Sequence, residues 1–424
     1  MFEVVFLKKL IYFLLLFSLF VYLLSELTPI PSAARYFGDL ILALIVVGSL
    51  KQGRNLLEIK QIRTIWLSIS VLALYSLISA IVNQVPILLM VYAFRNTFRF
   101  YFFFLMVYLY WDQEDVKRFF NLLLIIQLIN VPLTIYQYLF ITKNGDNIGG
   151  IFGTGKGVNG SSNLFFLILV IYYSLAYFHK KAKFLQFLAT ISSTVVLAVI
   201  AEIKYFFIEI LVIAIVIVLL NLRSKRSAII LVTMVAGLGA GFLILQRMIP
   251  GAFYTLIKID NLVKYMTMTE GGYYIGRAGA FGRINDLFFG HDIRRILFGL
   301  GFGSCEESSF AFLTSDFARV NGHLNYRYFS HALTYLETGL VGVVFYLFTF
   351  LAMVIDKLRE RDENNSDQFS KQMIILLFVT ILLNFVYNNS LKYEISYLVH
   401  FALAVPFVLN REIPLVMSFD KNCE

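Results

Sequence analysis

The stretch "YFSHALTYLETGLVGVVFYLFTF", residues 328–350, decides the fold class of this chain. From Gly339 onward it consists almost entirely of glycines and apolar side chains, a composition typical of a membrane-spanning helix. Its first half nevertheless carries His331, Tyr335 and Glu337. Ionisable groups inside a spanning helix are costly, and they are by default an indication of function. The stretch therefore predicts a membrane helix that has a functional polar face at one end.

The rest of the chain repeats this pattern. Of its 424 residues, 59% are hydrophobic and only 15% are charged, whereas about a quarter of the residues are charged in a typical soluble protein. We expect an all-α polytopic membrane protein, because apolar runs of about 18 residues recur along the whole length. The twelve expected spans are 10–27, 36–50, 64–83, 86–110, 119–141, 162–178, 184–202, 204–221, 228–246, 331–355, 372–390 and 393–410. The first run lacks a clear cleavage site, so we expect it to be retained as a span.

Basic clusters predict the orientation of these spans, because positive loops remain in the cytoplasm. Twelve passes place all of them on one side, with both termini cytoplasmic. The clusters are Lys8/Lys9, Lys51/Arg54/Lys60/Arg63, Lys117/Arg118, Lys180/Lys181/Lys183, Arg223/Lys225/Arg226 and Lys357/Arg359/Arg361.

Three regions follow from this topology. Residues 1–246 hold nine spans, 247–330 form one long extracytoplasmic loop, and 331–424 hold three spans and a cytoplasmic tail. Amphipathic helices are expected in the loop at about 252–268 and 283–297. A second outer loop, 142–161, is rich in glycine, which leaves open a tightly turning or a flexible loop.

Several classes of function are excluded. The net charge of +9 is mostly a signal of topology, so we expect no nucleic-acid partner. The sequence has no Walker A motif, no dinucleotide-binding glycine motif and no metal-ligand spacing of Cys and His, so we expect neither metal nor cofactor. Cys305 and Cys423 are too few for a disulfide framework and fall on opposite sides of the membrane.

His331, Tyr335, Thr338 and Gly342 share one face of the expected tenth span, whereas Glu337 lies well away from that face. His331 is a candidate for chemistry. The alternative is an interfacial histidine that is hydrogen-bonded to a loop carbonyl.

Arginine is the second theme, because its planar fork suits phosphate recognition. Arg277, Arg283, Arg294 and Arg295 stand among glycines in the long loop and are typical of an anion-binding surface. The alternative is that they pair with acidic residues of the same loop.

Arg95 and Arg99 lie one turn apart in the fourth span, where a charge needs a wet cavity or a carboxylate partner. Glu202 or Glu209 could supply that partner. The two arginines then either brace the bundle or line a lipid-phosphate site.

Four segments resemble the O-antigen polymerase (Wzy) and O-antigen ligase superfamily, membrane glycosyltransferases of the GT-C class. They are "GGIFGTGKGVNGSSNLFFLIL" (149–169), "VIAEIKYFFIEILVI" (199–213), "GRINDLFFGHDIRRILFGLGFGS" (282–304) and "HALTYLETGLVGVVFYLF" (331–348). The second is similar to the polymerase form of its motif. Where many ligases have a His-Asn pair, this chain has Tyr328, so the resemblance favours a polymerase.

The resemblance implies metal-independent glycosyl transfer on the outer face of the bacterial cytoplasmic membrane. The substrate would be an undecaprenyl-diphosphate-linked oligosaccharide, and a chain-length regulator and a flippase would be partners. A hydroxyl would attack an anomeric carbon, and the lipid diphosphate would leave. A ligase of the same superfamily and a twelve-helix transporter or flippase remain alternatives.

Roles follow from this chemistry. His331 would be the general base, with His323 in reserve. The residues expected to bind the diphosphate or the rest of the substrate are Arg283, Arg277, Lys204, Arg294, Arg295, Arg95, Arg99 and Tyr335. Gly299, Gly301 and Gly303 would let the loop backbone approach the glycan closely.

Overall fold

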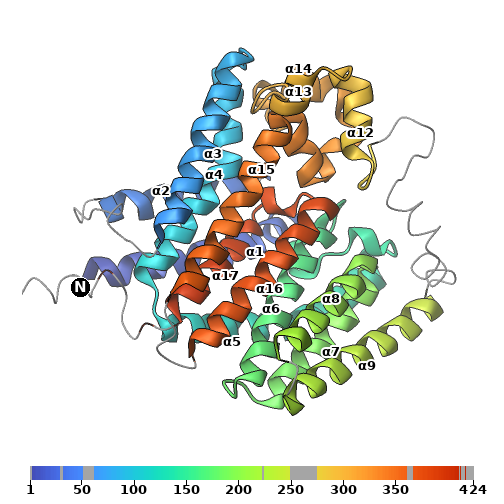
Figure 1. Ribbon diagram of the computed structural model, residues 1–424. Coiled ribbons are helices and arrows are strands. Elements are labelled where there is room, and N and C mark those ends of the chain that lie inside the picture. Colours follow the sequence, from blue (N-terminus) through green and yellow to red (C-terminus); the bar gives the residue numbers. More distant parts are fainter. Residues whose placement is uncertain are drawn as a thin grey trace, which may run out of the picture.

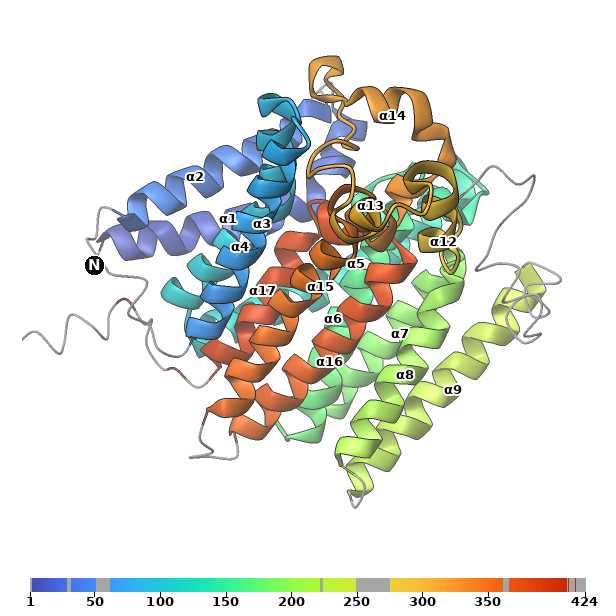
Figure 2. The ribbon, with the colours of Figure 1, turned by 45° about the horizontal axis from the view of Figure 1, so that its top comes forward.

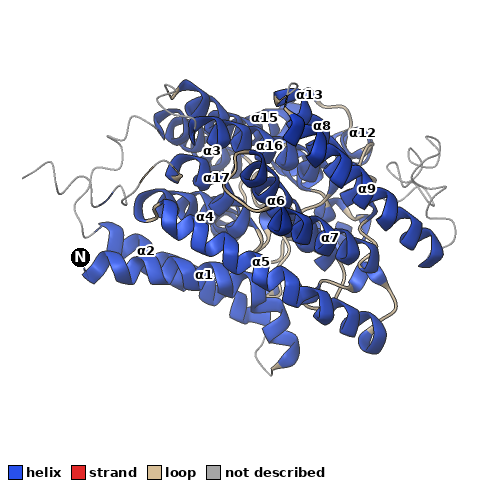
Figure 3. Cartoon of the chain, turned by 90° about the horizontal axis from the view of Figure 1, so that it is seen from below, coloured by secondary structure: helices blue, strands red, loops and turns tan. Residues whose placement is uncertain are grey.

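The computed structural model describes residues 2–28, 32–50, 62–221, 224–248, 275–360, 366–409, 411 and 416. Within these ranges the chain is built from helices joined by loops and contains no strand (Figure 3). The prediction of an all-α membrane protein is confirmed. The helix expected at about 252–268 and Cys423 lie outside the described residues.

Each of the twelve expected spans corresponds to a helix. These helices are α1 (Phe2–Leu27), α2 (Phe37–Leu50), α3 (Arg63–Val82), α4 (Ile87–Tyr110), α5 (Gln113–Tyr136), α6 (Val158–Phe178), α7 (Phe184–Ile200), α8 (Lys204–Leu220), α9 (Lys225–Met248), α15 (Ser330–Arg359), α16 (Ser366–Tyr387) and α17 (Ser396–Val408).

Seven helices in the described part of the chain are long and apolar enough to cross a membrane: α1, α3, α5, α6, α9, α15 and α16. Helices α2, α7, α8 and α17 have 14, 17, 17 and 13 residues, fewer than the roughly 20 that an untilted span needs. The count of twelve spans therefore stays a prediction.

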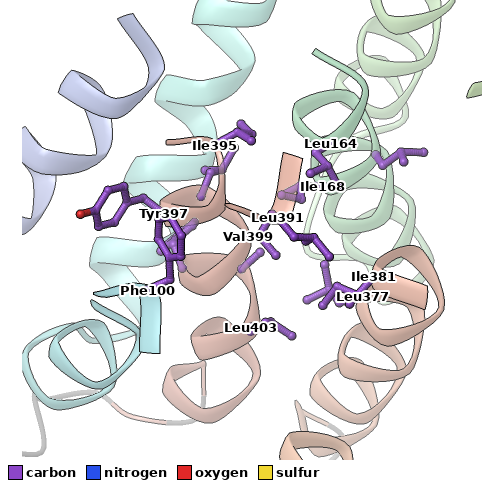
Figure 4. Packing of buried hydrophobic residues seen from close by; sticks show 14 of the residues in the cluster. Phe100, Leu164, Ile168, Leu377, Ile381, Leu391, Ile395, Tyr397, Val399 and Leu403 are labelled. Carbon is purple, nitrogen blue, oxygen red and sulfur yellow. The ribbon is translucent and has the colours of Figure 1, made fainter. Parts of the chain in front are cut away.

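Helices α4, α6, α16 and α17 form the centre of the bundle. Helix α17 packs against α4 and α16, and α6 packs against α16. Figure 4 shows Phe100 of α4 beside Tyr397 of α17, and Leu164 and Ile168 of α6 beside this core. In α6, 89% of the most apolar window is buried by protein, so α6 is an interior helix.

Helix α15 is broken rather than continuous. Gly339 has φ 63° and ψ −168°, a conformation that only glycine adopts readily. The break lets Leu300 N–H donate to the Leu336 carbonyl and Gly301 N–H donate to the Glu337 carbonyl, both at 2.9 Å. The long loop thus joins α15 through main-chain hydrogen bonds at the break.

The prediction of one continuous helix at 283–297 is wrong. The structure has α12 (Ala280–Ile284), a π-helical turn (Asn285–Phe289) and α13 (Ile293–Phe298). The chain turns between them because Gly290 and His291 both have a φ of 58°, which ends a right-handed helix.

The remainder of the described loop includes α14 (Asp316–Asn321). Helices α12, α13 and α14 gather at one end of the bundle, near the start of α15 (Figures 1 and 2). Helices α12 and α13 both contact α15.

The glycine-rich loop 142–161 is ordered, which decides between its two alternatives. The Gln137 side chain donates to the Gly150 carbonyl at 2.9 Å and accepts from the Gly150 N–H at 2.8 Å. Asn130 Oδ1 accepts from the Ile151 N–H at 2.9 Å. Three hydrogen bonds therefore fix the middle of the loop to α5 and the turn that follows it.

Candidate functional site

A cavity of about 650 Å³ lies where α1, α5 and α16 end and where α6 and α17 begin. Its wall is formed by the loop 142–161, by the turn between α16 and α17, and by parts of the long loop before α15. The wall is polar. It includes the basic residues Arg35, Lys156 and Arg277, the tyrosines Tyr22, Tyr328, Tyr387 and Tyr393, and the asparagines Asn144, Asn147, Asn159, Asn163, Asn325, Asn388 and Asn389.

Arg277 is held in one orientation on this wall. Its guanidinium carbon lies 4.5 Å from the centre of the Tyr387 ring and 5.1 Å from that of Phe329. Its Nε donates to the Tyr387 carbonyl at 3.1 Å. Tyr387 in turn stacks on Tyr205, with 3.8 Å between ring centres. The arginine is thus positioned before any ligand arrives, which reduces the entropy lost on binding.

Arg35 and Lys156 are the other cations of the wall. Arg35 Nη2 donates to the hydroxyls of Tyr36 and Ser309, both at 3.3 Å. Burial acts to lower the pKa of Arg35, but the Glu394 carboxylate together with Tyr36 and Tyr22 outweighs it and the net direction is upward, so the group is charged. Lys156 is exposed on the glycine-rich loop and is not ordered by any ion pair among the described residues.

Beneath the wall lies a buried carboxyl group. Glu209 of α8 is fully buried. Its two oxygens accept from the side-chain amides of Asn163 and Asn384, each at 2.6 Å. Asn388 on the wall donates to Asn384 Oδ1 at 3.0 Å. These four residues, here called the amide network, connect the cavity to the interior.

His331 lies behind Arg277 and is not on the cavity wall. Its Nε2 is 2.8 Å from the Arg277 carbonyl oxygen, and its Nδ1 is 3.3 Å from that of Phe385. The alternative of a histidine bonded to a loop carbonyl is confirmed. Tyr335, one turn further, donates to Asn285 Oδ1 and is also outside the cavity.

The remaining predicted site residues do not meet at the cavity. Lys204 begins α8, and Arg283 lies in α12. Arg294 and Arg295 are exposed on α13, where Arg295 donates to the Phe288 carbonyl. His323 is exposed, with Nδ1 3.1 Å from the Val320 carbonyl oxygen of its own turn. Of the residues expected from the sequence to act as a base or to bind the diphosphate, Arg277 is the one on the wall.

The acidic residues of the long loop pair with other arginines. Arg327 forms an ion pair with Glu307, and Arg319 forms one with Asp316 at 3.1 Å. The alternative of pairing within the loop stays a prediction for the four arginines to which it applies, Arg277, Arg283, Arg294 and Arg295.

Arg95 and Arg99 brace the bundle. Arg95 Nε lies 2.8 Å from one oxygen of Asp39, and Arg99 Nη1 lies 3.0 Å from the other. Arg99 Nη2 also lies 3.3 Å from Glu394 Oε1. The expected partners in segment 202–209 are wrong, because the carboxylates come from α2 and from the residues just before α17.

The glycines of the segment 299–303 make close contacts with protein. A Cβ on Gly301 would lie 2.7 Å from the Asn83 Cβ, and one on Gly303 would lie 2.8 Å from the Leu89 carbonyl oxygen. Neither glycine is on the cavity wall. Their role in this structure is to seat the loop on α3, α4 and α15.

A second buried cluster lies beside the break in α15. Lys392 Nζ is 3.8 Å from Glu306 Oε1 and 4.0 Å from Glu337 Oε2. Glu337 Oε1 accepts from the Cys305 N–H at 3.1 Å. Burial, and then the Glu337 carboxylate, raise the pKa of the Cys305 thiol. A cavity of about 20 Å³ beside Glu337 and Lys392 is the size of one water molecule.

Sequence reasoning missed most of the wall. Lys156 and Asn163 lie inside the segment 149–169 that carries the resemblance, so a signal for them was present. Arg35 and the pair Asn388–Asn389 stand in short loops without a motif, and only the folded chain brings them to the cavity.

Among the described residues, no group of three or more His, Cys, Asp and Glu side chains could hold a metal ion. A scan against protein-family models and a search of curated proteins both found no match to this chain.

Proposed function

We propose that this protein is a membrane glycosyltransferase that polymerises polyprenyl-diphosphate-linked oligosaccharides in the cavity. The observation that carries the proposal is the composition of the wall, where three basic side chains face tyrosines and asparagines. Arginine and lysine neutralise a diphosphate, while amides and aromatic rings bind sugar hydroxyls and sugar faces. A volume of about 650 Å³ is in the range of small-ligand sites.

The origin of the lining segments supports the same proposal. They are the end of α1, the loop 142–161, the α7–α8 turn, the long loop, and the α16–α17 turn. The basic clusters predict that every one of these is extracytoplasmic. A donor held in the outer leaflet by its lipid would present its diphosphate at this level.

The proposed reaction is a single displacement. A hydroxyl oxygen of the acceptor glycan forms a bond to the anomeric carbon of the donor, and the bond from that carbon to the diphosphate oxygen breaks. The lipid diphosphate leaves with the electron pair, and Arg35, Lys156 and Arg277 stabilise its charge. The hydroxyl proton passes to Asp146, the one carboxylate among the described wall residues, which already accepts from Asn159 at 3.2 Å.

His331 takes a different role in this proposal from the one expected of a general base. Both of its ring nitrogens face backbone carbonyls, and a neutral imidazole has one N–H to donate. It holds the backbone of Arg277, so it is a positioning residue.

The test is polymer formation by purified protein. Undecaprenyl-diphosphate repeat units are incubated with the protein in detergent and EDTA, and the products are separated on a gel. We expect a ladder from the wild type, loss of the ladder in Arg277→Ala and Asp146→Asn, and a normal ladder in Arg118→Ala. Arg118 is an exposed arginine paired with Glu114, away from the cavity. A ladder that persists in both cavity variants would contradict the proposal.

Two alternatives have distinct products. A ligase would give no ladder but would transfer the glycan to an added acceptor lipid. Transport is favoured by one observation, the broken helix α15 with Glu337 and Lys392 beside it, because broken helices carry ion sites in many transporters. Movement of a lipid-linked glycan across proteoliposomes without new glycosidic bonds would support transport.

A further inference from the structure

Asn163 is an unusual part of the cavity wall. Asn163 is fully buried, and it is also one of the residues that line the cavity. Its Nδ2 donates to Glu209, but its Oδ1 has no hydrogen-bond partner within the described part of the chain. A buried acceptor without a partner costs about 1–3 kcal/mol. A residue of the cavity wall thus holds a buried acceptor that has no partner among the described residues.

A 180° rotation of the Asn163 side-chain amide would not remove the unpaired acceptor. The Asn163 Nδ2 donates to two oxygens, to Glu209 Oε2 at 2.6 Å and to Asn384 Oδ1 at 3.3 Å. Turning Asn163 by 180° would set its carbonyl oxygen against the Asn384 carbonyl oxygen, which accepts hydrogen bonds and donates none. Asn384 is fixed as well, because it donates to the Thr380 carbonyl and accepts from Asn388.

The burial of Glu209 also indicates a functional role for this network. The residue is fully buried in an otherwise apolar helix and forms no ion pair among the described residues. Burying an ionisable side chain without a charged partner is costly. An apolar residue at this position would favour folding, so the carboxyl group indicates function.

The chemistry of the missing partner follows from the unpaired atom. Asn163 Oδ1 needs a hydrogen-bond donor. Phosphate oxygens at neutral pH accept hydrogen bonds and do not supply this donor. A sugar hydroxyl or an acylamino N–H supplies the donor and has no charge.

From this geometry we propose that Glu209 is a positioning residue that fixes Asn163 Oδ1 as the sugar-binding acceptor of the cavity. The cavity then has two parts: the cationic wall of Arg35, Lys156 and Arg277 for the diphosphate, and the amide floor for the sugar attached to it. This inference rests on the proposed function.

The test compares two lipids on the same protein in nanodiscs. One is undecaprenyl diphosphate, and the other is undecaprenyl diphosphate carrying one N-acetylhexosamine. We expect the wild type to bind the sugar-bearing lipid about tenfold more tightly, the effect of about one hydrogen bond. Glu209→Gln should lose this preference and keep the affinity for the sugar-free lipid, because a glutamine amide presents one N–H₂ and forces one asparagine to turn.

Two further variants make the result specific. Asn163→Ala removes the acceptor itself and should lose the preference in the same way. Glu202→Gln, a matched change in the nearby α7–α8 turn and off the cavity wall, should keep it.

The outcomes separate the two proposals. A preference that survives in Asn163→Ala, or in a folded Glu209→Gln, would overturn the positioning role. If Glu209→Gln fails to fold, Asn163→Ala decides alone. A wild type that binds both lipids equally overturns this inference only, whereas a wild type that binds neither lipid overturns the proposed function together with it.

Discussion

Arg99 and Arg277 are the same side chain in two different settings. Arg99, 5% exposed, lies between Asp39 and Glu394 in the interior, and its charge is balanced there by carboxylates. Arg277 is stacked against Tyr387 and Phe329 and lines the cavity of about 650 Å³. The difference teaches that the surroundings of a charge, and not its burial, separate a brace from a binding group.

Arg99→Ala should have the largest effect of any change in this comparison, and the effect should be on stability. It leaves the buried Glu394 carboxylate without its arginine, while the partly exposed Asp39 keeps its ion pair with Arg95. Breaking a buried ion pair costs about 3–5 kcal/mol. Thermal unfolding in detergent should show a melting temperature lower by about 10 °C. Arg99→Lys, which keeps the charge, should lose less, and an unchanged melting temperature in Arg99→Ala would show that the network is no brace.

Arg277→Ala should have a large effect on the reaction rate and a small effect on stability. Removing one preorganised cation from a reacting diphosphate lowers the rate about 100-fold, while the melting temperature should change much less than in Arg99→Ala. Initial rates of ladder formation measure the first effect, and thermal unfolding measures the second. Equal losses of stability in the two variants would remove the distinction between brace and binding group.

His331 variants test whether the position of Arg277 matters, because His331 contacts the Arg277 backbone carbonyl. His331→Ala loses contacts with two buried carbonyls and should lower both the rate and the free energy of unfolding, the latter by about 1–3 kcal/mol. His331→Gln can still donate to one carbonyl and should recover most of the rate. A Gln variant as inactive as the Ala variant, with normal stability, would indicate a general base instead.

Cys305 should give the smallest effect. Burial and the nearby Glu337 carboxylate raise the pKa of its thiol, so the reactive thiolate is scarce at neutral pH and forms only at higher pH. In a Cys423→Ser background, Cys305 should resist a maleimide reagent until the protein is unfolded. Rapid labelling of the folded protein would show that the loop against α15 opens readily.

The sequence predicted the local parts of this structure well. Apolar runs placed all twelve helices, with ends that differ from the structure by up to eight residues, because each helix is decided largely by its own side chains. The glycine-rich loop and Arg277 were also found from local composition. The break at Gly339 was not, because it depends on Leu300 and Gly301 arriving from a distant segment.

The cavity shows the same limit more clearly. Arg35, Asn163 and Asn388 are far apart in the chain and carry no shared spacing. The partners of Arg99 come from α2 and from the α16–α17 turn, although segment 202–209 offered carboxylates at a plausible depth. Periodicity reports the face of one helix, whereas a site or a brace requires knowing which helices become neighbours.

The most direct measurement blocks the cavity chemically. Tyr328 lies on the wall and is partly exposed, so Tyr328→Cys in the Cys423→Ser background offers one reactive thiol there. Val320→Cys, exposed on α14 and outside the cavity, is the control. The account predicts that maleimide labelling at 328 abolishes the polysaccharide ladder while labelling at 320 leaves it unchanged. A full ladder from the protein labelled at 328 would contradict the claim that transfer takes place in this cavity.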